Sequence, residues 1–358
     1  MLAKLSPLGK ARPHELNLVT YNVLCSSLCA PTYFKHCPED HLDPKRRLDR
    51  VLAALDEHVS RNAVICLQEV STLWVGRLHA FFQERDYHLV HSSYARAWQG
   101  YMGCALAFPN ATYAADAVEV VRVSDTKKGR WPRPPQPTML ASVSEAVTRF
   151  FSGVGTLLGQ GPPARPQRNH WDAAKSRLNT MILAQLRTKQ GDRASAKTFC
   201  VATYHMPCMF YAPKVMVIHT ALALQKVQSF SKGHPCILAG DFNFKPEDSC
   251  YGLATSGTLD ASDATYPEGD EANAGSMDCL FGMQSAYATK LGAEPEFTNL
   301  ARIRDDPVFC ATLDYIFCSP GMQVKDVVAL PKREDIEYVL PTPEYPSDHL
   351  LLGATFNI

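Results

Sequence analysis

The feature that most constrains the fold of this chain is a series of short apolar runs that each carry a polar side chain at one edge. The runs are rich in β-forming residues and therefore predict buried strands. A carboxylate, amide or imidazole at the end of a buried strand is held on a rigid element while its head group faces a cleft. The polar residues in these positions are Asn22, Glu69, His205, Asp241 with Asn243, Asp314, and Asp348 with His349.

Strand and helix patterns alternate from the start of the chain. Leu16 to Leu24 and Ala63 to Leu67 are typical of strands, and Asp49 to His58 between them has apolar residues at helical spacing. This alternation favours an α/β fold built in layers. The other predicted strands are Tyr87 to Ser92, Cys104 to Phe108, Leu178 to Leu186, Thr198 to Thr203, Pro235 to Ala239, Thr312 to Cys318 and Leu350 to Phe356, and the other predicted helices are Leu73 to Arg85 and Val215 to Phe230.

The charge balance narrows the classes of function. The 358 residues contain 36 Lys and Arg against 36 Asp and Glu, so the formal net charge is zero. A protein that coats long nucleic acid through non-specific phosphate contacts is broadly basic, and this balance excludes that class. The charge balance does not exclude a local basic groove on the surface. The chain has no run of 18 or more apolar residues, so no membrane span is expected.

The cysteines bear on the compartment. Twelve are scattered along the chain, mostly in apolar runs, which is typical of buried reduced thiols in an intracellular protein. A cytoplasmic or nuclear location is expected, with an organelle matrix open, since Met1 to Glu15 lacks the apolar core of a secretory signal. One cluster of cysteines and histidines suggests a zinc site, but the spacing of these residues matches none of the strong zinc patterns. Its members are Cys25, Cys29, His36, Cys37 and His41.

The pattern breaks between about residues 124 and 177, where prolines and basic residues concentrate. A helix is predicted from Val143 to Leu158 within this segment. The segment is either a surface insertion or a basic lid over a substrate groove. Trp131 and Trp171 at its edges either stack on bases or anchor the loop. A second loop-like stretch, Asp260 to Gly275, is acidic.

The polar residues at the strand edges suit one kind of metal. Asp241 and Asn243 are two apart, so their side chains project the same way in an extended chain. Gly240 before them lets the backbone turn or approach a neighbour closely. Asp348 adjoins His349, whose side chain has an unperturbed pKa near neutrality. Carboxylate and amide oxygens are hard ligands suited to Mg²⁺, with Mn²⁺ as the alternative, rather than to zinc.

Six motifs follow one another over nearly the whole chain. They are Tyr21-Asn22-Val23-Leu24, Leu67-Gln68-Glu69-Val70, His205, Gly240-Asp241-Phe242-Asn243, Leu313-Asp314-Tyr315 and Ser347-Asp348-His349. Together and in this order they resemble the endonuclease/exonuclease/phosphatase superfamily, which has the DNase I-like fold. The resemblance implies a four-layer α/β/β/α sandwich of two mixed β-sheets flanked by helices. It also implies a single domain over residues 1–358, enlarged by the basic, proline-rich insertion.

Further motifs are Tyr21 to Cys25, Cys37-Pro38 before a basic helix with Arg46 and Arg47, Ser285-Ala286-Tyr287, Phe297-Thr298-Asn299 and Phe309 to Phe317. They are similar to the deadenylase, nocturnin and Angel-type branch of that superfamily. In deadenylases of this branch an Asn in a Phe-Thr-Asn motif and a Phe five residues before the Leu-Asp-Tyr aspartate contact adenine. Here the matching positions are Asn299 and Phe309. The chain departs from the branch pattern in three places. These are the segment Met206 to Pro213, the longer linker from Asn299 to Asp314, and the 124–177 insertion.

The resemblance also implies roles for the site residues. Glu69 would be the main Mg²⁺ ligand, with Asn22 supporting it and Asp348 completing the metal side. Asp241 and Asn243 would orient the attacking water and the phosphate. His349, kept charged by Asp314, would bind the scissile phosphate or act as an acid or base. His205 would donate to a non-bridging oxygen. Phosphoester hydrolysis needs these elements, namely charge compensation, an activated water and donors at the developing charge.

The function that the resemblance implies is Mg²⁺-dependent 3′–5′ exoribonuclease activity on adenine-rich RNA. One alternative is a phosphatase or phosphodiesterase that acts on a small nucleotide or another small phosphorylated substrate. A DNA-repair type of nuclease shares the core motifs but fits the motif context less well. A binding scaffold that has lost activity is opposed by the intact acids and histidines. No leucine-rich repeat occurs in the sequence, so docking to a deadenylase scaffold complex is not expected, and the oligomeric state is left open.

Overall fold

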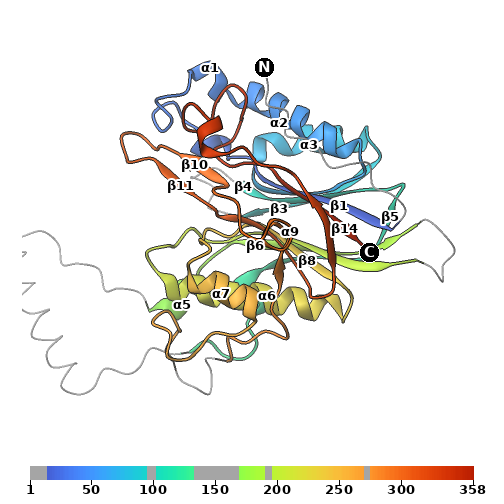
Figure 1. Cartoon of the computed structure of the whole chain (residues 1–358), viewed down its shortest axis with the longest axis vertical. Coiled ribbons are helices and arrows are strands. Elements are labelled where there is room, and N and C mark those ends of the chain that lie inside the picture. Colours follow the sequence, from blue (N-terminus) through green and yellow to red (C-terminus); the bar gives the residue numbers. More distant parts are fainter. Residues whose placement is uncertain (1–13, 95–101, 133–168, 190–195, 270–274) are drawn as a thin grey trace, which may run out of the picture.

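The computed structural model describes residues 14–94, 102–132, 169–189, 196–269 and 275–358. Two six-stranded mixed sheets lie face to face in the middle of the molecule (Figure 1). The first sheet has the order β13-β14-β1-β2-β4-β3. Its strands are β1 (Glu15–Asn22), β2 (Val64–Ser71), β3 (Tyr87–Tyr94), β4 (Met102–Pro109), β13 (Gln323–Val327) and β14 (Leu352–Asn357).

The second sheet has the order β5-β6-β7-β8-β12-β9, and a separate two-stranded ribbon pairs β10 with β11. The strands of the second sheet are β5 (Tyr113–Arg122), β6 (Thr180–Thr188), β7 (Thr198–His205), β8 (Cys236–Asp241), β9 (Gln284–Ser285) and β12 (Asp314–Cys318). The ribbon consists of β10 (Asn299–Ala301) and β11 (Phe309–Ala311).

Helices cover the outer face of each sheet (Figure 1). On the first sheet lie α2 (Pro44–Val59) and α3 (Thr72–Gln83), and on the second lie α5 (His170–Lys175), α6 (Pro213–Ser231) and α7 (Ser249–Ser256). The predicted four-layer sandwich is therefore confirmed. The remaining short elements are α1 (Glu39–Leu42), α9 (Ala286–Leu291), η1 (Ser26–Leu28), η3 (Val123–Thr126) and η4 (Arg333–Asp335).

The alternation of side chains along each strand explains the four layers. In β1, Leu16 and Leu18 face the second sheet, while Val19 and Tyr21 face α2 and α3. Successive side chains of a strand point to opposite faces, so a strand that is apolar on both faces must be covered on both. The central core joins residues of the two sheets and contains Leu18, Cys66 and Leu106 together with Ile182, Val201 and Ile237.

One predicted boundary and one of the strands missing from the prediction have local causes. The helix predicted from Asp49 begins earlier, at Pro44, because Asp43 accepts hydrogen bonds from the backbone N–H groups of Lys45 and Arg46 and thereby caps it. The unpredicted strand β5 is a half-exposed edge strand without a clear apolar alternation. The helix predicted for residues 143–158 lies outside the described residues. Among the described helices, none has the length and apolar character needed to cross a membrane.

Candidate active site

The topology brings the polar ends of five strands to one edge of the sandwich. β1 and β2 are parallel, so Asn22 and Glu69 leave the first sheet at the same edge. β7 and β8 are also parallel, and His205 pairs with Asp241 at their carboxyl ends. β12 runs antiparallel to β8 and places Asp314 directly opposite Asp241. The predicted site residues are thus gathered by strand order, not by nearness in the sequence.

Glu69 is aimed into the site by an irregularity in β2. The pairing of β2 with β4 shifts between Leu67 and Val70, which is the signature of a β-bulge. Glu69 lies in this bulge with a φ of 58°, in the left-handed region that glutamate rarely adopts. One carboxylate oxygen accepts a hydrogen bond from the backbone N–H of Cys25 at 2.8 Å. The bulge therefore holds the carboxylate in place at the cost of local backbone strain.

Gly240 permits the close approach of β7 and β8 next to the site. A Cβ atom at this position would lie 1.9 Å from the carbonyl oxygen of Tyr204, and φ is 154°. Only glycine fits this approach. After it, the side chain of Asp241 accepts a hydrogen bond from the backbone N–H of Asn243 at 3.0 Å. The amide of Asn243 donates to the carbonyl of Met206 at 3.0 Å, which ties the two segments that follow β7 and β8.

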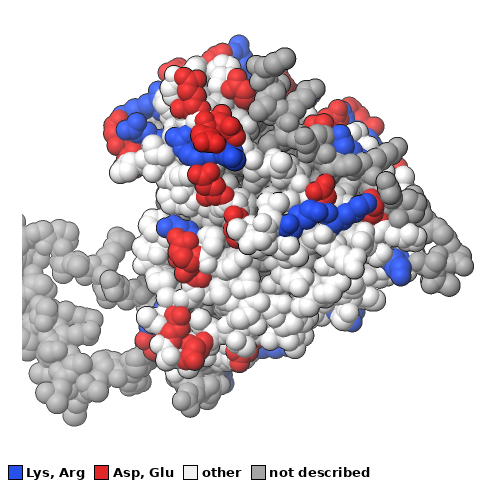
Figure 2. Space-filling model, viewed as in Figure 1, with Lys and Arg blue, Asp and Glu red and all other residues white. Residues whose placement is uncertain are grey.

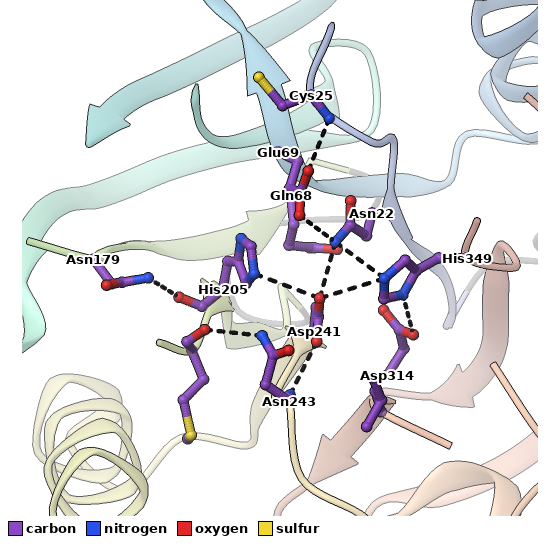
Figure 3. Close-up of polar contacts among 12 residues, drawn as sticks. Asn22, Cys25, Gln68, Glu69, Asn179, His205, Asp241, Asn243, Asp314 and His349 are labelled. Atoms are coloured by element: carbon purple, nitrogen blue, oxygen red, sulfur yellow. Dashed lines mark hydrogen bonds and ion pairs between the residues drawn. The ribbon is translucent and has the colours of Figure 1, made fainter. Parts of the chain in front are cut away.

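Asp241 lies at the centre of the polar network (Figure 3). Its Oδ2 atom accepts a hydrogen bond from Asn22 Nδ2 at 2.9 Å, and the same amide donates to Glu69 Oε1 at 3.2 Å. The Nε2 atoms of His205 and His349 lie 3.5 and 3.7 Å from Asp241 Oδ2. Two imidazoles, two carboxylates and one amide thus converge on a space only a few ångströms across.

His349 and Asp314 form a buried ion pair. The Nδ1 atom of His349 lies 2.8 Å from Asp314 Oδ2. Burial opposes the charge of His349, but Asp314 and Asp241 outweigh it and raise the imidazole pKa well above its ordinary value. Burial also raises the pKa of Asp314 to about 6, against the opposing effect of His349. The pair agrees with the predicted role of Asp314 as the group that orients His349 and keeps it charged.

The acidic side chains fit a divalent cation. Ligand atoms of Glu69, His205 and Asp241 all lie within 4.8 Å of one another, and so do those of Asp241, Asp314 and His349. Asp314 Oδ1 is buried without a hydrogen-bond partner. Burial raises the pKa of the nearby Asp348, and Glu69 raises it further although His349 opposes this. Clustered carboxylate oxygens of this kind suit Mg²⁺ or Mn²⁺.

The ribbon β10–β11 places Asn299 and Phe309 on the same face as His349. Asn299 forms a β-bridge with His349, and the flanking hydrogen bonds make it a non-hydrogen-bonded pair, whose side chains lie close together. Phe309 pairs with Ala301, two residues along β10 from Asn299, so both side chains project from one face. Asn299 is buried, whereas Phe309 is 43% exposed. Of the two predicted substrate-binding residues, Asn299 therefore lies beside His349, and Phe309 projects from the same face further along the ribbon.

Several residues that support the site were not assigned a role from the sequence. Tyr94 contacts His205 Nδ1 through its hydroxyl, and Asn179 Nδ2 donates to the carbonyl of His205 at 2.9 Å. Thr298 donates to Asp314 Oδ2 at 2.7 Å. Arg47, fully buried, donates to the carbonyls of Val23, Leu24 and Pro346. Two of them were part of motifs in the sequence, Thr298 as the middle residue of the Phe-Thr-Asn motif and Arg47 as a member of the basic helix that resembles the branch.

Two alternatives from the sequence find no support in the structure. Cys29 and Cys37 pack in a small apolar cluster with Phe34, and among the described residues no group of three candidate ligands forms there. The zinc interpretation of this cluster is therefore not retained. Trp171 is buried, and its indole N–H donates to the carbonyl of Glu268 at 2.7 Å. It anchors the end of the 124–177 insertion, of which residues 133–168 lie outside the described part.

With this geometry established, comparisons with known proteins become informative. The model of the Endonuclease/Exonuclease/phosphatase family matches residues 19–349, nearly the whole chain. The chain belongs to this family. The match starts within β1 and ends at His349, so it includes every metal and catalytic residue predicted from the motifs. The prediction of a phosphoester-hydrolysing enzyme is confirmed at the level of the family.

The sequence relatives point to one branch. The CCR4-Not complex 3′-5′-exoribonuclease subunit Ccr4 of Aspergillus niger is 24% identical over 392 residues, which cover 96% of this chain and 52% of that protein. Carbon catabolite repressor protein 4 homolog 4 of Arabidopsis thaliana is 38% identical over 126 residues, which cover 34% of this chain and 27% of that protein. The chain thus spans about half the length of these relatives or less.

Solved structures share the fold. The crystal structure of ANGEL2, a 2′,3′-cyclic phosphatase, has a TM-score of 0.69 at 19% identity, with 96% of this chain and 95% of that chain covered. The human nocturnin catalytic domain has a TM-score of 0.58 at 18% identity, with 97% and 95% covered. Together with the sequence relatives, these neighbours agree with the predicted deadenylase, nocturnin and Angel-type branch. At such identities the likeness of the structures shows the fold alone.

Proposed function

We propose that this protein is a Mg²⁺-dependent phosphodiesterase that removes nucleotides from the 3′ end of adenine-rich RNA. The observation that carries the proposal is the juxtaposition of the buried acidic centre with Asn299 and Phe309 on the face of His349. An exonuclease that prefers one base must hold that base beside the scissile phosphate. An amide and a partly exposed aromatic ring next to the acidic centre meet that need.

Each residue has a chemical role in this proposal. Glu69, Asn22 and Asp348 would hold a divalent cation, which when bound supplies compensation for the phosphate charge. Asp241 accepts hydrogen bonds at the centre and would orient the attacking water, with Asn243 fixing the turn beside it. His349, held charged by Asp314, would donate a hydrogen bond to the phosphate, and the N–H of His205 would donate to a non-bridging oxygen.

The surface bears on the choice between a polymer and a small substrate. Lys, Arg, Asp and Glu are interspersed on the face shown in Figure 2, and no basic track runs the length of that face among the described residues. A polymer bound mainly through its phosphates would need such a track. The described residues of this face offer no such track, and the proposal rests on recognition of the terminal nucleotides by Asn299 and Phe309. The free cysteines fit a reducing compartment, so the proposal places the enzyme inside the cell.

One experiment separates the candidate functions. Purified protein with Mg²⁺ is incubated with poly(A), mixed RNA, single- and double-stranded DNA, and a panel of phosphorylated nucleotides, including 2′,3′-cyclic phosphates. A ladder of single-nucleotide steps on poly(A), with release of AMP, is the expected result. Phosphate release or ring opening on small nucleotides, with every polymer intact, would replace the proposal by the phosphatase alternative. Cleavage confined to DNA would replace it by the repair-nuclease alternative.

A further inference from the structure

Tyr94 lies at the end of β3, an edge strand of the first sheet, and reaches across to His205 on β7 of the second sheet. The Tyr94 hydroxyl is hydrogen-bonded to Nδ1 of His205, and the two rings meet edge to face with centroids 5.9 Å apart. Tyr94 is only 6% exposed. We propose that Tyr94 is a positioning residue that holds His205 in the tautomer with its proton on Nε2.

The direction of the hydrogen bond between Tyr94 and His205 follows from the surroundings of the other ring nitrogen of His205, Nε2. His205 Nε2 lies 3.5 Å from Oδ2 of Asp241. A carboxylate only accepts hydrogen bonds, so the favourable arrangement places a proton on Nε2. In a neutral imidazole the second nitrogen is then an acceptor, and the Tyr94 hydroxyl must be the donor to Nδ1.

Tyr94 is suited to remain a donor. Burial raises the pKa of its phenol well above the ordinary value, and the nearby Cys104, Glu69 and Asp241 raise it further. Ionisation of the phenol would place another negative charge beside an acidic centre, so the hydroxyl keeps its proton throughout the neutral range. The hydroxyl is therefore available to donate to Nδ1.

A second buried tyrosine–histidine pair in the same protein has the same arrangement, and there the acceptor at Nε2 of the histidine is a backbone carbonyl. The Tyr204 hydroxyl lies 2.9 Å from Nδ1 of His219, and Nε2 of His219 lies 3.0 Å from the carbonyl oxygen of Ala174. A backbone carbonyl only accepts, so His219 carries its proton on Nε2 and takes the hydrogen bond of Tyr204 at Nδ1. The Tyr94–His205 pair repeats this geometry with the carboxylate of Asp241 in place of the carbonyl.

The consequence for the reaction rests on the proposed function. An N–H at Nε2 of His205 faces the acidic centre and can donate to a non-bridging phosphate oxygen as negative charge develops there. The opposite tautomer would present a lone pair to the same oxygen and repel it. Tyr94 therefore contributes to the reaction without touching the substrate, by acting together with Asp241 to keep the proton of His205 on Nε2.

Nitrogen NMR of ¹⁵N-histidine-labelled protein tests the tautomer without substrate. His205→Asn identifies the His205 signals by their loss, and His219 serves as the internal reference. We expect His205 to show one protonated nitrogen, Nε2, and one unprotonated nitrogen, Nδ1, in the pattern of His219. We expect Tyr94→Phe to change this pattern for His205 alone. A proton on Nδ1 in the wild type, protons on both nitrogens, or an unchanged pattern in Tyr94→Phe would each overturn the proposal.

Kinetics then tests the use of that proton. Tyr94→Phe is expected to lower kcat about tenfold with little change in KM, which corresponds to the loss of one well-placed hydrogen bond. Tyr87→Phe is the matched control, because Tyr87 is buried in the same strand but donates to the carbonyls of Val59 and Ala63, away from the site. A changed tautomer with unchanged kcat would refute the assigned role of His205 and leave the tautomer assignment standing. An inactive wild type would refute the proposed function only.

Discussion

At the scale of single residues, the acidic centre of the candidate active site consists of carboxylates that the fold holds close together. Asp241 and Asp314 face each other across β8 and β12, and each is almost fully buried. Their mutual repulsion contributes to the raised pKa of Asp314. Such a cluster is unfavourable for the fold unless cations offset it, and the charged His349 does so only in part. Functional sites often retain strain of this kind at the expense of stability.

The first prediction concerns Asp241→Asn. Loss of this carboxylate removes the central acceptor of the network, and hydrolysis is expected to fall by about 10³-fold or more. Stability in EDTA is expected to stay the same or to rise, because a buried charge without a metal is removed. Activity assays and thermal unfolding measure the two effects. The exposed pair of Asp116 with Arg187 provides the control, since Asp116→Asn should change neither. A destabilised Asp241→Asn variant with near-normal activity would contradict the assignment.

The second prediction concerns Phe309. If its ring stacks on the terminal base, Phe309→Ala should raise KM for adenine-ended RNA about tenfold, with a smaller change in kcat. Val308→Ala is the control, because Val308 is the adjacent residue and is similarly exposed. Steady-state kinetics on short RNAs that end in A or in U measures the effect. An equal KM for Phe309→Ala and the wild type on A-ended RNA would remove Phe309 from the substrate site.

At the scale of elements, site geometry depends on how closely neighbouring strands approach. β7 and β8 carry His205 and Asp241 at their ends, and Gly240 allows the backbone of β8 to pass the carbonyl of Tyr204. In the first sheet, the β-bulge in β2 aims the side chain of Glu69 into the site. Asp241 follows Gly240 by one position and Glu69 lies within its bulge, and strands commonly re-aim a residue at such irregularities.

The third prediction compares two glycines. Gly240→Ala is expected to destabilise the protein by about 3 kcal/mol, because its methyl group would overlap the carbonyl oxygen of Tyr204 and force the strands apart. Gly76→Ala in α3 is the control, since a Cβ there meets nothing within 4 Å. Removing a glycine from a helix should stabilise by about 1 kcal/mol. Urea unfolding measures both values. A neutral Gly240→Ala would show that β7 and β8 do not need this approach.

The sequence predicts elements well where a pattern is strong and poorly where contacts decide. The sequence predicted β1, β2, β7 and β8 from their apolar runs and α6 from its stripe of apolar residues. Burial of one or both faces requires apolar residues at these positions, so the pattern is visible in the sequence. The edge strand β5 was missed, because half of its side chains are exposed and nothing requires them to be apolar. The roles of Tyr94 and Asn179 were not predictable, because they arise from contacts with His205 over long sequence separations.

At the scale of the whole molecule, the fold buries titratable side chains outside the polar network of the site, and these make the fold sensitive to acid. His219 is fully buried between Tyr204 and Ala174, and burial lowers its pKa to about 4. His58 on α2 is also buried, and burial lowers its pKa to about 4 as well. Both imidazoles are therefore neutral in the native protein at neutral pH.

The fourth prediction follows from these two histidines. Their folded pKa lies below the ordinary value of 6.5, so the unfolded chain takes up a proton first as the pH falls. The free energy of unfolding should therefore decrease between about pH 6.5 and pH 4, by about 3 kcal/mol for each histidine. Urea unfolding at several pH values measures this. His219→Gln should flatten the profile by about half. An identical pH profile for the variant and the wild type would contradict the assignment.

The candidate site as a whole was more predictable than its supports. The six motifs named Asn22, Glu69, His205, Asp241, Asp314 and His349, and strand order brings all six together. Asn299 and Phe309 were identified by resemblance, and the ribbon places Asn299 beside His349 and Phe309 on the same face. The placement of Arg47, which joins the ends of two catalytic segments by their carbonyls, needed the three-dimensional structure.

The most direct test of the central claim is the release of AMP from the 3′ end of an RNA tail of adenosines, followed as Mg²⁺ is added to the EDTA-treated enzyme. The wild type should be inactive in EDTA and should release AMP one nucleotide at a time as Mg²⁺ is restored. Glu69→Gln should need far more Mg²⁺ or fail to recover. AMP release by the wild type in EDTA, or full recovery of Glu69→Gln at the same Mg²⁺ concentration, would contradict the account.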